Sequence, residues 1–161
     1  MHYTISPLDR AEFEPMFAMD DAQLAEHGAV RVTANADQGF PCRVSLSDAK
    51  KGDELILLHH VSHDVATPYR SAYAIFINQD ADQSEALVDA IPPVFEGRPI
   101  AFRGYGEDGT LKDVRLGLGG DHDEKIRALL DNPQVGYIHA HNAAHGCYAA
   151  RIDRCGGDDD Q

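Results

Sequence analysis

The chain of 161 residues has the length of one domain, and its 43% apolar and 25% charged residues are the composition of a globular protein. With 27 acidic against 14 basic side chains, its formal charge of −13 repels phosphate backbones and anionic membrane surfaces, so neither nucleic acid nor a membrane is an expected partner. Three cysteines, no apolar run approaching the ~18 residues of a membrane span, and no signal-peptide pattern favour a reduced, cytoplasmic protein.

The first third of the chain predicts two short helices followed by strands. The helices have capping-box spacings, namely Ser6 with Asp9 before residues 9–18, and Asp20 with Gln23 before residues 20–27. The strands are an alternating one at 30–34, a short candidate at 42–46, and two that are apolar on both faces, 54–61 and 72–78. Residues 84–90 are a candidate helical turn that Pro92 and Pro93 must end.

The remainder predicts hairpins and one longer helix. Segments 99–106 and 110–118 flank a hairpin turn, and a helix with Ile126, Leu129 and Leu130 on one face follows the capping-box spacing of Asp121 and Glu124. Strands 135–141 and 147–153 close the chain. Hairpins without βαβ alternation predict an α+β fold, with a mainly antiparallel sheet of about seven or more strands and three or four short helices. We expect a single domain over 1–154 and a disordered acidic tail over 155–161.

Histidines near the carboxyl end form a candidate metal site. His139 and His141 are two apart in a predicted strand, so they project to one face, and His145 in the next loop can complete a three-histidine set with an open position. Zinc or a similar divalent ion is therefore the one cofactor that the sequence suggests. The alternative is that His139 and His141 are hydrogen-bonded sheet histidines without a metal.

Two cysteines form a candidate thiol site. Cys42 is followed by Arg43, Cys147 follows His145-Gly146, and a guanidinium or imidazolium beside a thiol stabilises its thiolate form. A catalytic arrangement would use Cys42 or Cys147 as nucleophile, His139 as base and Asn142 to orient the base. The alternative is that both cysteines are small, buried hydrophobic residues.

Arginines suggest a third kind of site. Arg43, Arg103 and Arg151 lie in or beside predicted strands of a chain poor in positive charge, and a guanidinium is suited to a carboxylate or a phosphate. Tyr69 can supply an apolar wall with a polar tip to such an anion pocket. The alternative is that these arginines form surface salt bridges with the abundant acids.

Several short motifs follow one another along the chain: Pro41-Cys42-Arg43 with Leu46, Thr67-Pro68-Tyr69, Arg103-Gly104-Tyr105 with Asp108-Gly109, His139 with Asn142-Ala143 and Gly146-Cys147, and Arg151-Ile152-Asp153-Arg154. The order of these motifs resembles that of a bacterial family known as domain of unknown function 1203. The resemblance extends over nearly the whole chain, to about Arg154. It implies a small, stand-alone bacterial protein and carries no activity with it.

The resemblance also separates the candidate residues. The last family motif resembles Val-His-Val-Arg-Asn-Ala-Ala-Ala-Gly-Cys, which His139, Asn142 and Cys147 match, whereas His141 and His145 depart from it. A metal site that needs His141 and His145 would then be peculiar to this chain. The thiol and arginine candidates fall on family positions.

The expectation we favour is a binding domain for a small, anionic molecule. Its pocket would lie between the 41–43 segment and the 139–147 hairpin, where unlike polar residues of two distant segments gather. If Arg43 and Asn142 shared no cavity, this expectation would fail. A Cys/His-dependent enzyme and a His-coordinated metal site are the alternatives, and the sequence leaves a homo-oligomer open.

Overall fold

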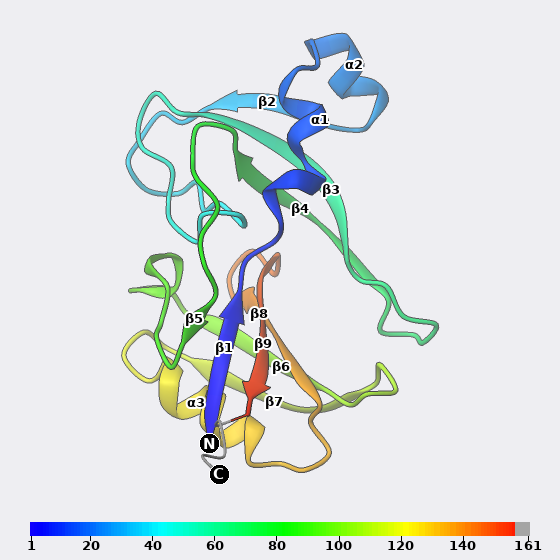
Figure 1. Ribbon diagram of the computed structural model, residues 1–161, viewed down its shortest axis with the longest axis vertical. Helices are drawn as coiled ribbons and strands as arrows, with labels where there is room; N and C mark the ends of the chain where they lie inside the picture. Colours follow the sequence, from blue (N-terminus) through cyan, green and yellow to red (C-terminus); the bar gives the residue numbers. More distant parts are fainter. Residues whose placement is uncertain (157–161) are drawn as a thin grey trace.

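The computed structural model describes residues 1–156 and contains two antiparallel sheets (Figure 1). The six-stranded sheet has the order β5 (Leu87–Val88), β1 (His2–Ser6), β9 (Tyr148–Cys155), β8 (Tyr137–Asn142), β6 (Ile100–Tyr105) and β7 (Leu111–Gly117). The three-stranded sheet has the order β2 (Val30–Thr33), β3 (Glu54–His63) and β4 (Ser71–Asn78). The helices are α1 (Glu14–Phe17), α2 (Asp21–Glu26) and α3 (His122–Leu130), with 3-10 turns η1 (Arg10–Glu12) and η2 (Pro93–Phe95). The α+β prediction is confirmed.

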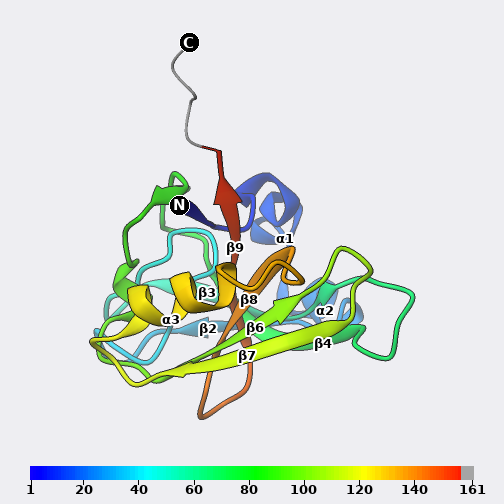
Figure 2. The same ribbon diagram turned by 90° about the horizontal axis from the view of Figure 1, so that it is seen from below.

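Helix α3 covers one face of the larger sheet. Ile126, Leu129 and Leu130 recur at helical spacing and are buried in one core with sheet residues such as Phe102 and Ile138. The helix lies alongside β6, β7 and β8 (Figure 2). No helix within residues 1–156 has the length and apolar character that a membrane crossing requires.

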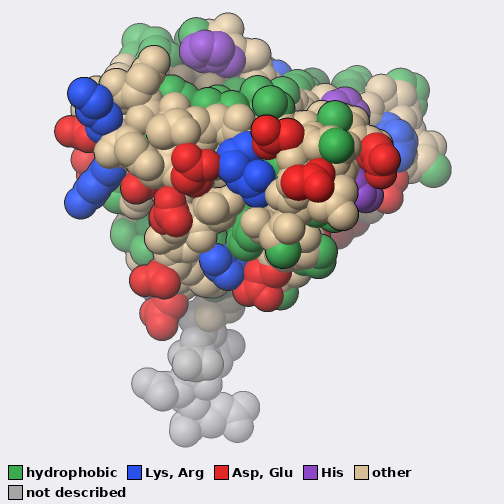
Figure 3. Space-filling view, turned by 90° about the horizontal axis from the view of Figure 1, so that it is seen from above, with side chains coloured by type: hydrophobic (Ala, Val, Ile, Leu, Met, Phe, Trp, Pro, Cys, Tyr) green, Lys and Arg blue, Asp and Glu red, His purple; other side chains and the backbone are tan. Residues whose placement is uncertain are grey.

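A second core joins the short N-terminal helices to the smaller sheet. Phe13 and Leu24 pack against strand residues that include Ile56 and Ile75, and Cys42 is buried in the same cluster. This end of the molecule is the upper part of Figure 1, where the chain leaves β1 and runs to α1 and α2. Acidic and basic side chains are interspersed on the face seen from above (Figure 3).

The two sheets touch at the tips of their hairpins. The Thr67 hydroxyl in the β3–β4 turn donates to the carbonyl of Gly109 in the β6–β7 turn at 2.9 Å. Gly109 has a φ of +76°, and a Cβ there would lie 2.8 Å from a methyl of Val65. The contact therefore requires glycine at this turn, both for the backbone conformation and for the close approach.

Strand β7 is an edge strand whose exposed backbone is partly covered by its own side chains. The backbone N–H of Val114 donates to the Asp113 carboxylate at 2.8 Å, and Arg115 donates to the Val114 carbonyl at 2.8 Å. Exposed apolar side chains, among them Val114 and Leu116, line the same strand. Charged side chains that occupy edge groups disfavour pairing with another strand.

The sequence predictions missed strand β1. Tyr3 and Ile5 alternate inward along it and are buried, and the whole strand pairs with β9. Ser6 belongs to this strand, so its predicted capping box with Asp9 is wrong. Asp9 instead caps η1 by accepting from the backbone N–H of Ala11.

The other helix predictions are corrected in detail. The helix predicted over 9–18 is split into η1 and α1, because Pro15 fits only the first turn of a helix. The Asp20–Gln23 capping box is confirmed. The capping box predicted at Asp121 is absent. Within residues 1–156 the Asp121 side chain makes no capping hydrogen bond to α3, and it accepts instead from the backbone N–H of Leu118 at 2.7 Å.

Three boundaries also differ from prediction. Residues 84–90 contain the short strand β5 in place of a helical turn. The candidate strand 42–46 forms only an isolated bridge at Cys42, and Leu46 has a positive φ of 54°, which a strand does not contain. Strand β9 extends to Cys155, and residues 157–161 of the predicted tail lie outside the described residues.

Candidate functional site

The loop over residues 39–48 is held in place by backbone bridges and by a buried sulfur. Pro41 bridges Asp48, and Cys42 bridges Phe76 of β4. The Sγ of Cys42 accepts backbone N–H groups of Val44, Ser45 and Asn78 at 3.4, 3.4 and 3.2 Å. With 1% of its surface exposed, the predicted nucleophile Cys42 is a structural acceptor at the base of this loop.

Arg43 extends from this loop to the β8–β9 hairpin. Its Nε donates to the Tyr148 carbonyl at 2.8 Å, its Nη1 to the Pro41 carbonyl at 2.6 Å, and its Nη2 to the Cys147 Sγ at 3.1 Å. Only 2% of the residue is exposed. The side chain therefore fixes the two predicted segments, 41–43 and 139–147, against each other.

The charge of Arg43 has no carboxylate partner among the described residues. Burial lowers the pKa of the guanidinium, and the groups that oppose this shift are the sulfurs of Cys147 and Cys42. Arg98 lines the same pocket but has a counter-charge. Its two terminal nitrogens form a bidentate ion pair with the Asp48 carboxylate at 3.0 and 2.6 Å. A buried cation without a counter-charge is costly, so this site would gain from an added anion.

The loop between β8 and β9 presents Cys147 and Asn142 beside Arg43. The Gly146 N–H donates to the Asn142 carbonyl at 2.7 Å, and a φ of +78° at Gly146 closes the turn. The Asn142 side-chain amide donates to the Cys147 Sγ at 3.4 Å. Arg43 and Asn142, the pair on which the sequence expectation depends, thus share the sulfur of Cys147 as acceptor.

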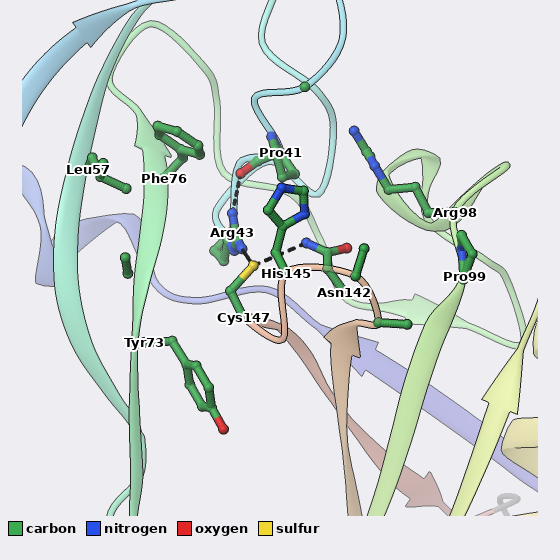
Figure 4. Close-up of a pocket in the computed structure, with 14 residues that line it drawn as sticks. Pro41, Arg43, Leu57, Tyr73, Phe76, Arg98, Pro99, Asn142, His145 and Cys147 are labelled. Atoms are coloured by element: carbon green, nitrogen blue, oxygen red, sulfur yellow. Dashed lines mark hydrogen bonds between the residues drawn. The ribbon is translucent and has the colours of Figure 1, made fainter.

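These side chains line a pocket of about 490 Å³ (Figure 4). Its polar lining comprises Arg43, Tyr73, Arg98, Asn142, His145 and Cys147. Its apolar lining includes Pro41, Leu57, Ala74, Phe76, Pro99 and Ala143. Leu57 and Phe76 form one side in Figure 4, and Asn142 and Pro99 face them from the other. The shared cavity that the sequence analysis required is present.

The predicted ligands His139 and His141 lie on the face of β8 opposite Ile138, and neither is among the residues that line the pocket. They belong to an aromatic cluster in which the His139 ring is 5.1 Å from His63 and 5.1 Å from Tyr148. Nδ1 of His139 and Nε2 of His141 are buried without a hydrogen-bond partner within residues 1–156. Hence His139 forms no hydrogen bond with Cys42 or Cys147.

Burial controls the protonation of this cluster. Burial, with His63 and His141 adding to it, lowers the pKa of His139 to about 3. Burial, with Arg103 adding to it, lowers the pKa of His141 to about 4. Both imidazoles are therefore neutral at neutral pH.

The remaining arginine and tyrosine candidates lie outside the pocket lining. Arg103 donates to the Tyr73 hydroxyl at 2.9 Å. Arg151 pairs with Asp153 and lies 4.3 Å over the Tyr137 ring. Tyr69 is exposed on the β3–β4 turn. Of the four candidates only Arg43 lines the pocket, whereas Tyr69 and Arg151 contact rings of the aromatic cluster, Tyr105 and Tyr137.

A three-histidine metal site is not formed. Within residues 1–156, no group of three His, Cys, Asp or Glu side chains is placed to hold a metal ion. His145 lines the pocket, whereas His139 and His141 lie in the aromatic cluster, and the Nδ1 of His141 bonds the Gly146 carbonyl at 2.9 Å.

Sequence reasoning missed several pocket residues. Leu57 and Phe76 were assigned only to central strands, and Arg98 and Pro99 carried no motif. The one available signal was position, because Arg98-Pro99 lies at the start of the predicted strand 99–106, which corresponds to β6 and pairs with β8. Without the pairing order of the strands, that position could not be connected to the 41–43 segment.

Comparison with known proteins gives one match, to a family model. No curated protein and no solved structure matches the chain. The family model described as protein of unknown function (DUF1203) matches residues 39–154, a span that contains every lining residue of the pocket. The family expected from the short motifs is the one found. The chain belongs to the DUF1203 family.

Proposed function

We propose that the protein binds a small, anionic molecule in the pocket beside Arg43. The observation that carries this proposal is the guanidinium itself, which is 2% exposed, lines the pocket and forms no ion pair with a described carboxylate. Two carbonyls and a sulfur satisfy part of its hydrogen bonding without balancing its charge. A bound anion would balance it.

The dimensions of the pocket support the proposal. A volume of about 490 Å³ falls within the ~300–1,000 Å³ of small-molecule sites. Such sites combine apolar walls with a few convergent polar groups, and here Arg43, Asn142 and Cys147 supply those groups.

Anion-dependent stabilisation tests the proposal. The melting temperature is measured at constant ionic strength as chloride is replaced by acetate, butyrate or phosphate, because a ligand that binds only the folded state raises it. We expect at least one of these anions to raise the melting temperature of the wild-type protein and to have no such effect on Arg43→Met.

The matched control is Arg31→Met. It removes another partly buried arginine, whose partners within residues 1–156 include the Met19 and Phe17 carbonyls and no lining residue, so it should retain the anion effect. Equal responses of wild type and Arg43→Met, or no response to any anion, would contradict the proposal.

A thiol activity at Cys147 is the second candidate. It is favoured by the two donors on Sγ, the Arg43 guanidinium at 3.1 Å and the Asn142 amide at 3.4 Å, inside a pocket. Such donors stabilise a thiolate. Because His139 forms no hydrogen bond with either cysteine within residues 1–156, the thiol proton would leave to solvent through the pocket.

Alkylation by iodoacetamide at neutral pH, followed for each cysteine by mass spectrometry, tests this candidate. If the two donors activate its sulfur, Cys147 reacts faster than Cys155 in the same chain, and Arg43→Met removes the difference. Equal rates for the two cysteines would contradict a thiol activity and leave anion binding as the function to pursue.

A further inference from the structure

We infer that the ligand of the Arg43 pocket is a monocarboxylate with an apolar body, such as a short fatty acid or a small aromatic acid. The inference rests on the proposed anion-binding function and adds the chemical class of the anion. It follows from three features of the pocket: the number of positive charges without a partner, the number of free donors, and the chemistry of the walls.

Of the two arginines that line the pocket, only one carries a positive charge without a carboxylate partner within residues 1–156. Arg98 is already neutralised by both oxygens of Asp48, and Arg43 alone has no described carboxylate partner. One negative charge on the ligand balances Arg43. A second negative charge would be buried without a counter-ion, in a protein that carries a net charge of −13.

The donors match the two oxygens of a carboxylate. A guanidinium has five N–H groups, and three of those of Arg43 donate to protein atoms within residues 1–156. Two remain, one on each terminal nitrogen. The side-chain amide of Asn142 donates one N–H to the Cys147 Sγ, and in the described part of the chain its second N–H is free to donate to a ligand. These three adjacent donors suffice for the two oxygens of a carboxylate, whereas the three charged oxygens of a phosphate dianion would need further donors from other lining residues such as His145.

The walls require an apolar body. Leu57 and Phe76 form one side of the pocket and Pro99 lies opposite them (Figure 4), and Ala74 and Ala143 add to the apolar lining. An inorganic anion would leave these carbons facing water. A hydrocarbon chain or ring attached to the carboxylate would cover them, and apolar contact increases affinity in proportion to the area removed from water.

A homologous series of acids tests the inference on the wild-type chain. Dissociation constants are measured by isothermal titration calorimetry for acetate, butyrate, hexanoate, 1-hexanol and inorganic phosphate at fixed ionic strength. We expect affinity to rise about fourfold for each added CH₂ that reaches the apolar wall. We expect hexanoate to bind at least about tenfold more tightly than 1-hexanol, because only the acid balances Arg43.

The outcomes separate this inference from the function on which it rests. Phosphate binding more tightly than hexanoate, or acetate binding as tightly as hexanoate, would overturn the monocarboxylate class and leave anion binding intact. Equal binding of hexanoate and 1-hexanol, or no binding by any probe, would overturn anion binding itself. In Arg43→Met the preference for hexanoate over 1-hexanol should disappear, and in the control Arg31→Met it should persist.

Discussion

Lowering the pH from 7 to 5 should destabilise the protein through His139 and His141. Both are almost fully buried, with 3% and 1% of their surface exposed. Burial lowers the pKa of His139 to about 3 and that of His141 to about 4, against ~6.5 in an unfolded chain. A buried histidine whose pKa is lower in the folded state than in the unfolded chain destabilises the fold once the unfolded chain begins to bind the proton. The free energy of unfolding is therefore unaffected at pH values above about 6.5 and decreases as the pH falls from 6.5 toward the folded pKa.

The expected loss follows from proton linkage. At pH 5 the unfolded imidazole is protonated and the folded one is not, so each histidine costs about 2 kcal/mol relative to pH 7. Together they remove about 4 kcal/mol, a large part of the ~5–15 kcal/mol that stabilises a typical domain. Burial also lowers the pKa of His60, which acts in the same direction. The depressed pKa of Asp108, about 2, places its titration below this window.

Urea unfolding at the two pH values measures this loss, and His139→Phe tests its origin. Phenylalanine fits the aromatic cluster, and His139 has no side-chain hydrogen bond to lose within residues 1–156. We expect the pH-dependent loss to shrink by about 2 kcal/mol in this variant. The control His27→Gln, at an exposed position, should retain the full loss. Identical pH dependence in wild type and His139→Phe would refute the reasoning.

Three further predictions concern the framework of the site. Arg43→Ala should lower the free energy of unfolding by roughly 3 kcal/mol or more, since it leaves two backbone carbonyls without their donor and opens a cavity; urea unfolding measures this. Gly109→Ala should cost more stability than Gly39→Ala, because both positions have positive φ but only the Cβ at Gly109 meets the facing hairpin; equal costs would contradict that contact. Asp113→Ala combined with Arg115→Ala should increase self-association, seen as a larger sedimentation coefficient, and an unchanged coefficient would mean that these side chains do not protect the edge.

Much of the fold could be predicted from local pattern. The β6–β7 hairpin and helix α3 carry strong local signals, a turn sequence and apolar residues at helical spacing, and both are present. Strand β1 has only five residues, and its alternation of Tyr3 and Ile5 is too short to stand out before Pro7. Its position depends on pairing with β9 at the far end of the chain, which no local pattern encodes.

The candidate site was predictable in part for the same reason. Arg43, Asn142 and Cys147 do meet, as the gathering of unlike polar residues in two segments indicated. The positions of the His139 and His141 side chains were not predictable, because they depend on which face of β8 packs against α3. Ile138 faces that helix, so His139 turns to the opposite face and joins the aromatic cluster, not the pocket.

Protection of Cys147 from alkylation most directly tests whether an anion occupies the Arg43 pocket. The rate of its reaction with iodoacetamide is measured on the wild-type protein with increasing acetate, butyrate, hexanoate or phosphate at constant ionic strength, and Cys155 serves as the internal reference. A bound anion beside Arg43 should slow alkylation of Cys147 in a saturable manner, leave Cys155 unchanged, and have no such effect in Arg43→Met. Rates at Cys147 that none of these anions changes would contradict anion binding in this pocket.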